Sequence, residues 1–336
     1  MKNLARVNKR LSIFVFMLGY GLLEVRATDL DGLRSKANEG DVEAMVELAE
    51  ARYWGRGVDL DWKKSFAWAE KASVREHPMA SYRMGVQYLL GQGVKEDIVL
   101  GQQLIKLSAD GIEKLAENSD HRAQFYIAIM FHYGIGRMDD IPKARQWMEL
   151  AAEGGQVDAQ YYMGLMYHLG VGAELKRDLI KAKHWWRMAA DQGHVPAQYH
   201  LGMVLLRSKK EKEQPEGMKY LKKAVDHKLD RAELFMGKVA MLGASMPKNA
   251  PVAFKNFENS ANQGYMRGQF LAGQALAKGV GVKPDPVAAS VWLTLVLKNH
   301  ELTPEQVARP TTPRAEMIRN ALASKRNLDA KLTTAQ

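Results

Sequence analysis

One pattern recurs seven times along the chain, and this repetition limits the possible folds more than any other feature. In its clearest copy, residues 159–193, a small residue opens an apolar segment, a Gly-x-Gly turn follows, and an acidic residue begins a second segment. The steps between copies are 36, 43, 36, 38, 35 and 36 residues, and the opening residues are Ala44, Ala80, Ala123, Ala159, Ala197, Ala232 and Gly268. Repetition at a period of about 20 to 50 residues is typical of solenoids, in which each unit packs against its neighbours.

Each unit is predicted to be two helices joined by a turn. The first helix carries a small residue at its middle, such as Gly85 or Gly164. Because Gly inside a helix costs about 1 kcal/mol relative to Ala, we expect a neighbouring helix to cross closely there. The Gly-x-Gly turn ends this helix, since Gly adopts the left-handed backbone of helix ends. The second helix begins at a side chain that caps free backbone N–H groups, and these caps are Asp61, Asp97, Asp140, Asp178, Asn249 and Asp285.

The second helix of each unit also carries a recurring bulky residue, which we expect to lie in the core. These residues are Trp68, Leu104, Trp147, Trp185, Tyr220 and Trp292. Three units depart from the pattern, and the sixth has only Gly243-Ala244-Ser245 at its turn. The third holds about seven extra residues near 112–118, which predicts two additional helical turns. The fifth has the charged sequence RSKKEKEQ at residues 207–214 in place of its Gly-x-Gly turn.

Together, the mid-helix glycines, Gly-x-Gly turns and Asx caps resemble the Sel-one-like repeat family, a helix-turn-helix relative of the tetratricopeptide repeat (TPR). The resemblance covers about residues 40–298. It implies an all-α fold, a right-handed α-solenoid of about seven Sel-one-like (TPR-like) helix-turn-helix repeats. A single helix pair cannot bury both of its apolar faces, whereas stacked pairs bury a continuous interior.

We predict four parts for the chain: a signal peptide at residues 1–27, an N-terminal cap at 28–40, the array of seven repeats at 41–298, and C-terminal capping helices with a tail at 299–336. In the last part, the sequence TPEQ from Thr303 is a capping-box pattern with Pro at the first helical position. Residues 314–328 predict an amphipathic helix.

The first 27 residues have the three parts of a secretory signal. Basic residues from Lys2 to Arg10 precede an apolar run of thirteen residues, Leu11–Leu23, and a small residue stands at Ala27. Thirteen helical residues rise about 20 Å, whereas the hydrocarbon core of a membrane is roughly 30 Å thick, so cleavage is favoured over a retained anchor. We expect cleavage after Ala27, release into the periplasm, and no stable membrane insertion of the mature protein.

The residues offer little for catalysis. The chain has no cysteine, which excludes disulfides, thiolate metal sites and Cys nucleophiles. The Gly-x-Gly turns lack the rest of a dinucleotide or phosphate-loop fingerprint, and no nucleophile-elbow motif is present. His132 and His168 hold the same position in consecutive units, but side chains about 10 Å apart cannot both bind one zinc at about 2 Å. We therefore expect a protein that is not an enzyme and that uses no cofactor or metal.

The charge of the chain bears on its partners. The formal net charge is +10, and residues 1–27 hold five basic residues and one acidic residue, so the rest carries 43 basic and 37 acidic residues, a net charge of +6. A mildly basic protein favours an acidic protein face or an anionic surface. Export and the interspersed acids disfavour nucleic acid. Residues 207–231, with nine basic and five acidic residues, are a candidate docking face, the alternative being a solvated helix surface.

The TPR resemblance also implies where a partner would bind. In TPR arrays the first helix of each unit lines the concave side. Carrying that over to the positions of this chain places on the concave face Tyr53, Trp54, Leu89, His132, Tyr133, His168, Leu169, Met203, Arg207 and Lys238. Exposed aromatic and Arg side chains are the usual anchors of protein interfaces, so these ten residues are the predicted partner-binding set.

Several functions suit an exported repeat array. The resemblance favours an immunity protein that neutralises a secreted antibacterial toxin, for example a type VI, lipase-like one. Such a toxin would offer an acidic or apolar docking surface. The alternatives are an adaptor or regulator of a cell-envelope machine, such as a flagellar motor, an exopolysaccharide exporter or a signalling system, and an exported factor that binds host proteins. An enzyme, such as a peptidoglycan hydrolase, has no supporting motif.

Overall fold

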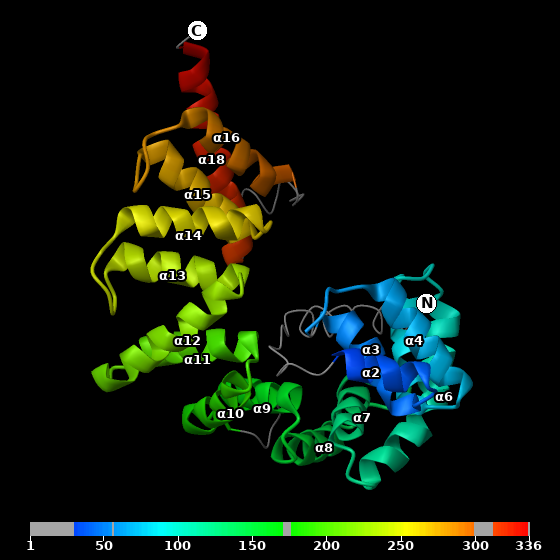
Figure 1. Cartoon of the computed structure of the whole chain (residues 1–336). Coiled ribbons are helices and arrows are strands. Elements are labelled where there is room, and N and C mark those ends of the chain that lie inside the picture. The colour runs from blue at the N-terminus through cyan, green and yellow to red at the C-terminus, as the bar shows by residue number, and fades with distance from the viewer. Residues whose placement is uncertain (1–29, 56, 171–175, 299–311, 335–336) are drawn as a thin grey trace. The chain divides into compact units, whose positions relative to one another are not determined.

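The computed structural model describes residues 30–55, 57–170, 176–298 and 312–334, and the regular elements there are helices (Figure 1). The predicted signal peptide and the capping-box sequence from Thr303 lie outside the described residues. Within the described ranges, no helix combines the length and the apolarity that crossing a membrane requires.

Fourteen helices form seven consecutive pairs, which confirms the predicted repeats. The pairs are α3 (Val42–Trp54) with α4 (Trp62–Val74), α5 (Pro78–Leu90) with α6 (Ile98–Glu117), α7 (His121–Tyr133) with α8 (Ile141–Glu153), α9 (Val157–Leu169) with α10 (Leu179–Asp191), α11 (Val195–Leu206) with α12 (Gln214–Asp226), α13 (Asp230–Leu242) with α14 (Ala250–Asn262), and α15 (Met266–Lys278) with α16 (Pro286–Lys298). Helix α2 (Leu30–Asn38) precedes the pairs, and α18 (Pro313–Thr334) follows them.

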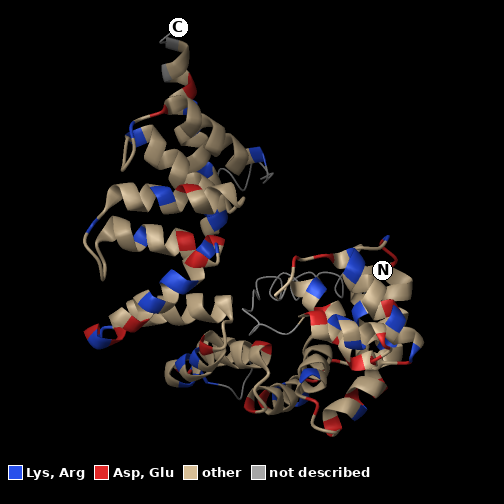
Figure 2. Ribbon diagram, in the orientation of Figure 1, with Lys and Arg blue, Asp and Glu red and all other residues tan. Residues whose placement is uncertain are grey.

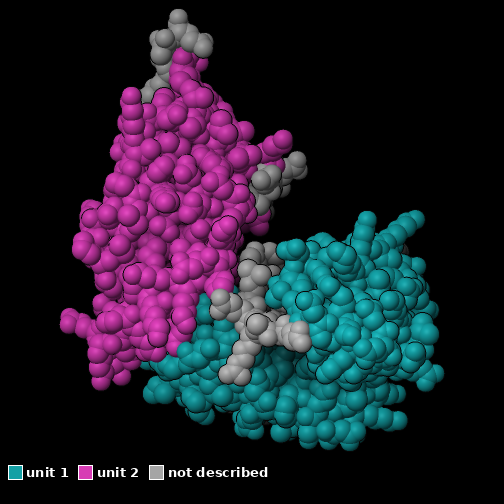
Figure 3. Space-filling model, viewed as in Figure 1, with its two compact units in different colours: residues 1–198 teal, residues 199–336 magenta. Residues whose placement is uncertain are grey.

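The chain divides into two compact units, residues 1–198 and residues 199–336 (Figure 3). Unit 1 contains α2 to α10, unit 2 contains α12 to α18, and the division falls within α11. At the end of unit 2, α18 packs on the last pair, with Ile318 and Leu328 in one apolar cluster with Leu293 of α16. This helix contains the predicted amphipathic segment at residues 314–328.

The predicted Asx caps all bind the helices that follow them. The Asp61 side chain accepts a hydrogen bond from the Lys64 N–H, and the other five caps accept from residues two or three positions later in the same way. The first helix of most pairs ends at a Gly with left-handed backbone, for example Gly91 at φ 62°. Caps and turns together explain why so many of the helices have thirteen residues.

The mid-helix glycines mark close helix crossings, as predicted. A Cβ atom built on Gly85 of α5 would lie 2.8 Å from the carbonyl oxygen of Gly101 in α6. A Cβ on Gly164 of α9 would overlap the indole of Trp186 in α10. At these two glycines, the first helix therefore contacts its partner through a position where a side chain does not fit.

The expected core position of the second helices was wrong by one residue. Trp68, Leu104, Trp147, Trp185 and Trp292 are only half-buried, and of the predicted set Tyr220 alone is buried. The buried side chains are the next in sequence, namely Ile105, Met148, Trp186, Leu221 and Leu293. The small residue after the cap, such as Ala182, faces the first helix, and position i+4 lies closer to that face than i+3 because the helix turns 100° per residue.

Two of the irregular repeats also differ in structure. Helix α6 has 20 residues, seven more than its counterparts, which confirms the two additional turns but places them in the second repeat and not the third. In the fifth repeat, α11 and α12 are joined through a short 3-10 helix, Glu211–Glu213, in place of the Gly-x-Gly turn.

The second glycine of the turn fits against the preceding repeat. Gly93 has φ 75°, and a Cβ on it would overlap the backbone of Trp62, the first residue of α4. We expect Gly93→Ala to lower the free energy of unfolding by about 2–3 kcal/mol, because it adds this overlap to the cost of a left-handed Ala. Gly155, at φ 90° with open space around its Cβ position, is the matched control. Urea unfolding should show a smaller decrease in the free energy of unfolding for Gly155→Ala than for Gly93→Ala. Equal decreases for the two variants would contradict the overlap.

Candidate functional site

The first helices of unit 1 are joined by a buried ion pair. Arg83 of α5 is 2% exposed and donates two hydrogen bonds to the Glu50 carboxylate of α3, with Nε–Oε1 and Nη2–Oε2 distances of 2.8 and 2.7 Å. The Tyr126 hydroxyl of α7 accepts from Arg83 and donates to Glu50 at 2.6 Å. Three consecutive repeats thus share one charge-assisted network.

Aromatic rings surround this ion pair. The Arg83 guanidinium lies 3.8 Å from the centroid of the Tyr53 ring, and the Trp54 indole N–H donates to Glu50 at 2.9 Å. Burial raises the pKa of Tyr53 to about 12. Burial acts to lower the pKa of Arg83, but the charge and hydrogen bond of Glu50, together with Tyr126 and Tyr53, outweigh it and raise that pKa. The Arg83 guanidinium therefore stays charged over the physiological range, and its hydrogen bonds are made within the protein.

Three predicted binding residues are part of this interior. Tyr53, Trp54 and Leu89 are 2%, 8% and 6% exposed. Tyr53 donates its hydroxyl to Gln92, and Leu89 packs against Gly101 of α6. These three side chains are core residues, which corrects the expectation that they line an exposed face. The physical reason is that adjacent first helices pack side by side and cover the residues between them.

The predicted residues of the third and fourth repeats have mixed placements. His132 and Tyr133 are half-buried, with ring centroids 4.6 Å apart, and burial raises the pKa of Tyr133. The His168 ring lies with its centroid 5.2 Å from that of the Trp186 ring of its own repeat, so His168 faces the second helix. Leu169 is 66% exposed. A role in partner binding for these four residues stays a prediction.

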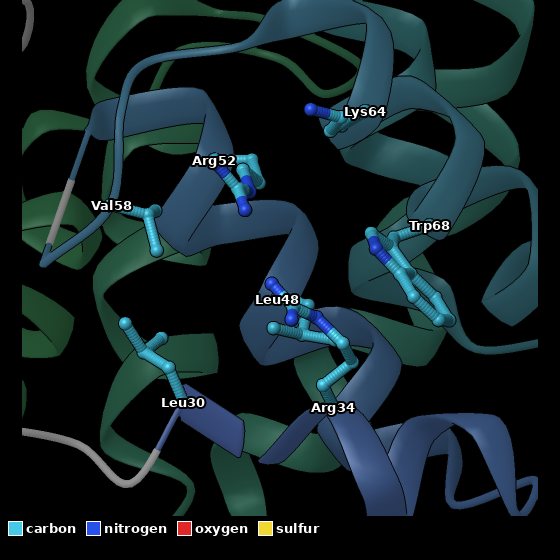
Figure 4. A pocket seen from close by; sticks show the side chains of 7 residues that line it. All are labelled: Leu30, Arg34, Leu48, Arg52, Val58, Lys64 and Trp68. Carbon is cyan, nitrogen blue, oxygen red and sulfur yellow. The ribbon is translucent and has the colours of Figure 1, made fainter.

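Unit 1 also has a small cavity of about 220 Å³ between α2, α3 and α4 (Figure 4). Its lining is Leu30, Arg34, Leu48, Arg52, Val58, Lys64 and Trp68. Its cationic groups have partners in the protein: Arg34 pairs with Asp31 at 3.6 Å, Lys64 pairs with Asp61 at 3.2 Å, and Arg52 donates to the Asp59 carbonyl. The cavity thus carries little unsatisfied charge for a ligand.

Unit 2 has a larger apolar cavity between its first helices. This cavity, of about 290 Å³, lies between α13 and α15 and has Phe257 of α14 in its lining. The other lining residues are Lys238, Met241, Leu242, Leu271, Gln274, Ala275, Lys278 and Val280. Leu242 is 77% exposed, so an apolar rim accompanies the apolar floor.

A second cavity of about 280 Å³ continues along the same helix. It is lined by Lys238, Arg267, Phe270, Leu271, Pro313, Glu316, Met317 and Asn320. Because Lys238 and Leu271 line both cavities, the two form one recess along α15, which we name the unit 2 groove. It is bounded by α13 on one side and reaches α18 at one end.

The unit 2 groove carries positive charge without internal partners. Lys238, Arg267 and Lys278 form no ion pair with any described residue. Burial, together with the charges of Arg267 and Arg207, lowers the pKa of Lys238. Figure 2 shows acidic and basic residues along the helices of both units. In unit 1, Arg83 of one first helix pairs with Glu50 of another. The groove therefore offers apolar surface flanked by cations that an acidic group would stabilise.

The predicted set and the groove overlap in part. Lys238 lines both cavities, Arg207 is exposed and lies over the Phe235 ring at 5.2 Å, and Met203 is half-buried. The sequence interpretation missed Arg267 and Lys278. A strict use of the repeat would have found Lys278, because it lies ten residues after Gly268, as Arg207 lies ten after Ala197.

The side chains that line the unit 2 groove are suited to binding. Its side chains are apolar, amide or cationic, apart from Glu316 at one end. Among the described residues, no three His, Asp or Glu side chains are placed to hold a metal ion. What the groove can supply is apolar contact area and fixed positive charge.

Solved structures with similar folds come from several bacteria. The c5321 protein, a protective antigen present in uropathogenic Escherichia coli, has a TM-score of 0.58 and 22% identity, over 91% of this chain and 66% of its own. This chain thus spans just under two thirds of that protein. A Sel1 repeat protein from Oxalobacter formigenes has a TM-score of 0.54 and 26% identity, over 87% of this chain and 80% of its own. The immunity protein Pa5087 of Pseudomonas aeruginosa has 20% identity over 70% of this chain and 88% of its own, and its TM-score of 0.42 is too low to carry a functional argument.

The sequence profile of the Sel1 repeat matches the chain seven times, at residues 42–73, 78–111, 121–156, 157–194, 195–228, 230–265 and 267–295. These matches cover more than half of the chain, and each overlaps one of the seven helix pairs. Sel1 repeats form scaffolds for protein–protein interaction. The chain is a member of the Sel1 repeat family.

Proposed function

We propose that this protein is a periplasmic scaffold that binds and neutralises a partner protein, and that the partner is a secreted antibacterial toxin. The protein would then be an immunity protein. The Sel1 repeats supply the scaffold, and the signal pattern of residues 1–27 directs it to the compartment that a sibling's toxin would enter.

The observation that carries this proposal is the unit 2 groove. Lys238, Arg267 and Lys278 flank apolar surface and have no acidic partner among the described residues. Lys238 is half-buried, and a partly desolvated charge without a partner is unfavourable in the isolated protein. A partner that brings carboxylates would offset that cost, so the groove favours association over the free state.

The test is a competition between sibling cells. We expect deletion of the gene to lower survival at least about tenfold in co-culture with the parent strain, and expression of the full chain to restore it. A tenfold change in Kd corresponds to only about 1.4 kcal/mol of binding free energy, which one charge pair can supply. A version without residues 1–27 should fail to protect, because it stays in the cytoplasm.

Three outcomes would contradict the proposal. Unchanged survival of the deletion strain, or resistance after deletion, would exclude an immunity role. Full protection by the version that lacks residues 1–27 would exclude action in the periplasm. Loss of motility or of exported polysaccharide, with no change in survival, would instead identify an adaptor of an envelope machine.

A further inference from the structure

The unit 2 groove has the length of a short helix. Its α15 side runs from Arg267 to Lys278, which is about 16 Å along the helix axis. Phe270 belongs to one cavity and Gln274 to the other, so the two cavities are about one helical turn apart. A helix with apolar side chains at positions i, i+3 or i+4, and i+7 would place successive anchors in them.

An extended segment fits the groove less well than a helix. The groove is built by helices, whose backbone groups are used within each helix, so it offers no strand edge for pairing. An extended segment would place unpaired N–H and C=O groups against Leu271, Met241 and Phe257. A helix satisfies these groups internally and presents only side chains.

The charged residues of the unit 2 groove indicate which charge a bound helix would carry. Lys238 lies where the two cavities meet, Arg267 lines the second cavity, and Lys278 lines the first. Glu316 is the single acid in the lining and lies on α18, at the end where the second cavity reaches that helix. Carboxylates beside the anchors would therefore meet cations along most of the groove, whereas basic residues would be repelled.

We propose that the unit 2 groove binds an acidic amphipathic helix of the partner protein. Apolar side chains one turn apart occupy the two cavities, and flanking carboxylates pair with Lys238, Arg267 and Lys278. A flat anionic membrane surface would touch the rim and leave the recessed Phe257 and Leu271 uncovered. This inference rests on the proposed function only in taking the partner to be a protein.

A designed peptide tests the proposal directly on the purified protein. The probe is a fluorescent helix of about 15 residues with Leu at i, i+4, i+7 and i+11 and Glu at the flanking positions. We expect saturable binding by fluorescence anisotropy. The same peptide with Gln in place of Glu should bind at least about tenfold more weakly. Raising NaCl from about 50 to 300 mM should weaken the Glu peptide more than the Gln peptide.

Variants locate the site. We expect Lys238→Glu with Arg267→Glu to weaken the Glu peptide at least about tenfold. The matched control is Lys222→Glu with Lys255→Glu, which changes the charge of unit 2 equally at exposed positions on α12 and α14. Leu271→Gln should weaken both peptides by removing apolar floor. Circular dichroism of each variant verifies that the helices remain.

Several results would overturn the inference. These are no saturable binding, equal binding of the Glu and Gln peptides, or equal weakening by the control pair. Charge-dependent binding to vesicles containing phosphatidylglycerol, without peptide binding, would assign the cations to a membrane surface. The competition assay is independent of the peptide. Sensitive deletion cells with no peptide binding would leave the immunity role standing and reject the groove, and the reverse result would reject the toxin as partner.

Discussion

Replacing Arg83 with Ala is expected to lower the free energy of unfolding by about 3–5 kcal/mol. The substitution leaves the Glu50 carboxylate, 12% exposed, without the guanidinium that compensates its burial. It also removes the cation from above the Tyr53 ring and one hydrogen bond from Tyr126. Urea unfolding followed by tryptophan fluorescence is a suitable measurement, because six of the seven tryptophans belong to unit 1.

Two further variants separate burial from charge. Arg34→Ala removes an Arg that pairs with Asp31 on the exposed surface, and its loss should stay below about 1 kcal/mol. The double variant Arg83→Met with Glu50→Leu removes both charges. Its free energy of unfolding should fall less than that of Arg83→Ala alone, because no unpaired charge remains buried. Equal losses for Arg83→Ala and Arg34→Ala would show that the network does not hold these repeats together.

The second large effect is expected at Trp186. This side chain is fully buried between α10 and α9, and Trp186→Ala should lower the free energy of unfolding by about 3–5 kcal/mol through lost apolar contact and a residual cavity. The neighbouring Trp185 is half-buried, so Trp185→Ala is a matched control with a smaller expected loss. The same urea unfolding experiment measures both, and a larger loss for Trp185→Ala would reject the corrected core position.

The contact between Gly164 and Trp186 gives a sharper test. Gly164→Ala should destabilise the wild type by about 1–3 kcal/mol, because the new methyl overlaps the indole. In the Trp186→Ala background the indole is absent, and the higher helix propensity of Ala should make the same change neutral or stabilising. A double-mutant cycle measures this coupling, and additive effects would contradict the close crossing.

Local features of the sequence accounted for most of the fold. The caps from Asp61 to Asp285, the Gly-x-Gly turns and the length of α6 depend on residues within a few positions of one another. Capping and helix termination depend on interactions between residues a few positions apart. The amino-acid sequence alone is therefore enough to predict where the helices begin and end. The sequence pattern selected Trp185 in place of Trp186 as the core residue because both positions lie near the same helix face. Which of the two is buried depends on packing against the neighbouring helix.

The binding face was less accessible to the sequence. Tyr53 and Trp54 have the aromatic character of interface anchors, and the sequence interpretation placed them on the surface. Their burial depends on Arg83, which lies about thirty residues away in the next repeat. Aromatic composition alone does not distinguish a ring that packs on a buried guanidinium from a ring that is exposed on a partner-binding surface.

The sequence by itself determined the number of repeats, the ends of their helices and the close crossings at the mid-helix glycines, because these follow from short-range capping, turns and a regular period. Only the tertiary structure decided which charges are satisfied. Glu50, Arg83 and Tyr126 come from three repeats and meet in the interior. Lys238 and Arg267, in contrast, line an open groove and form no ion pair with the described residues. Electrostatic free energy depends on distances through space and on burial, and neither is encoded at any one position of the repeat.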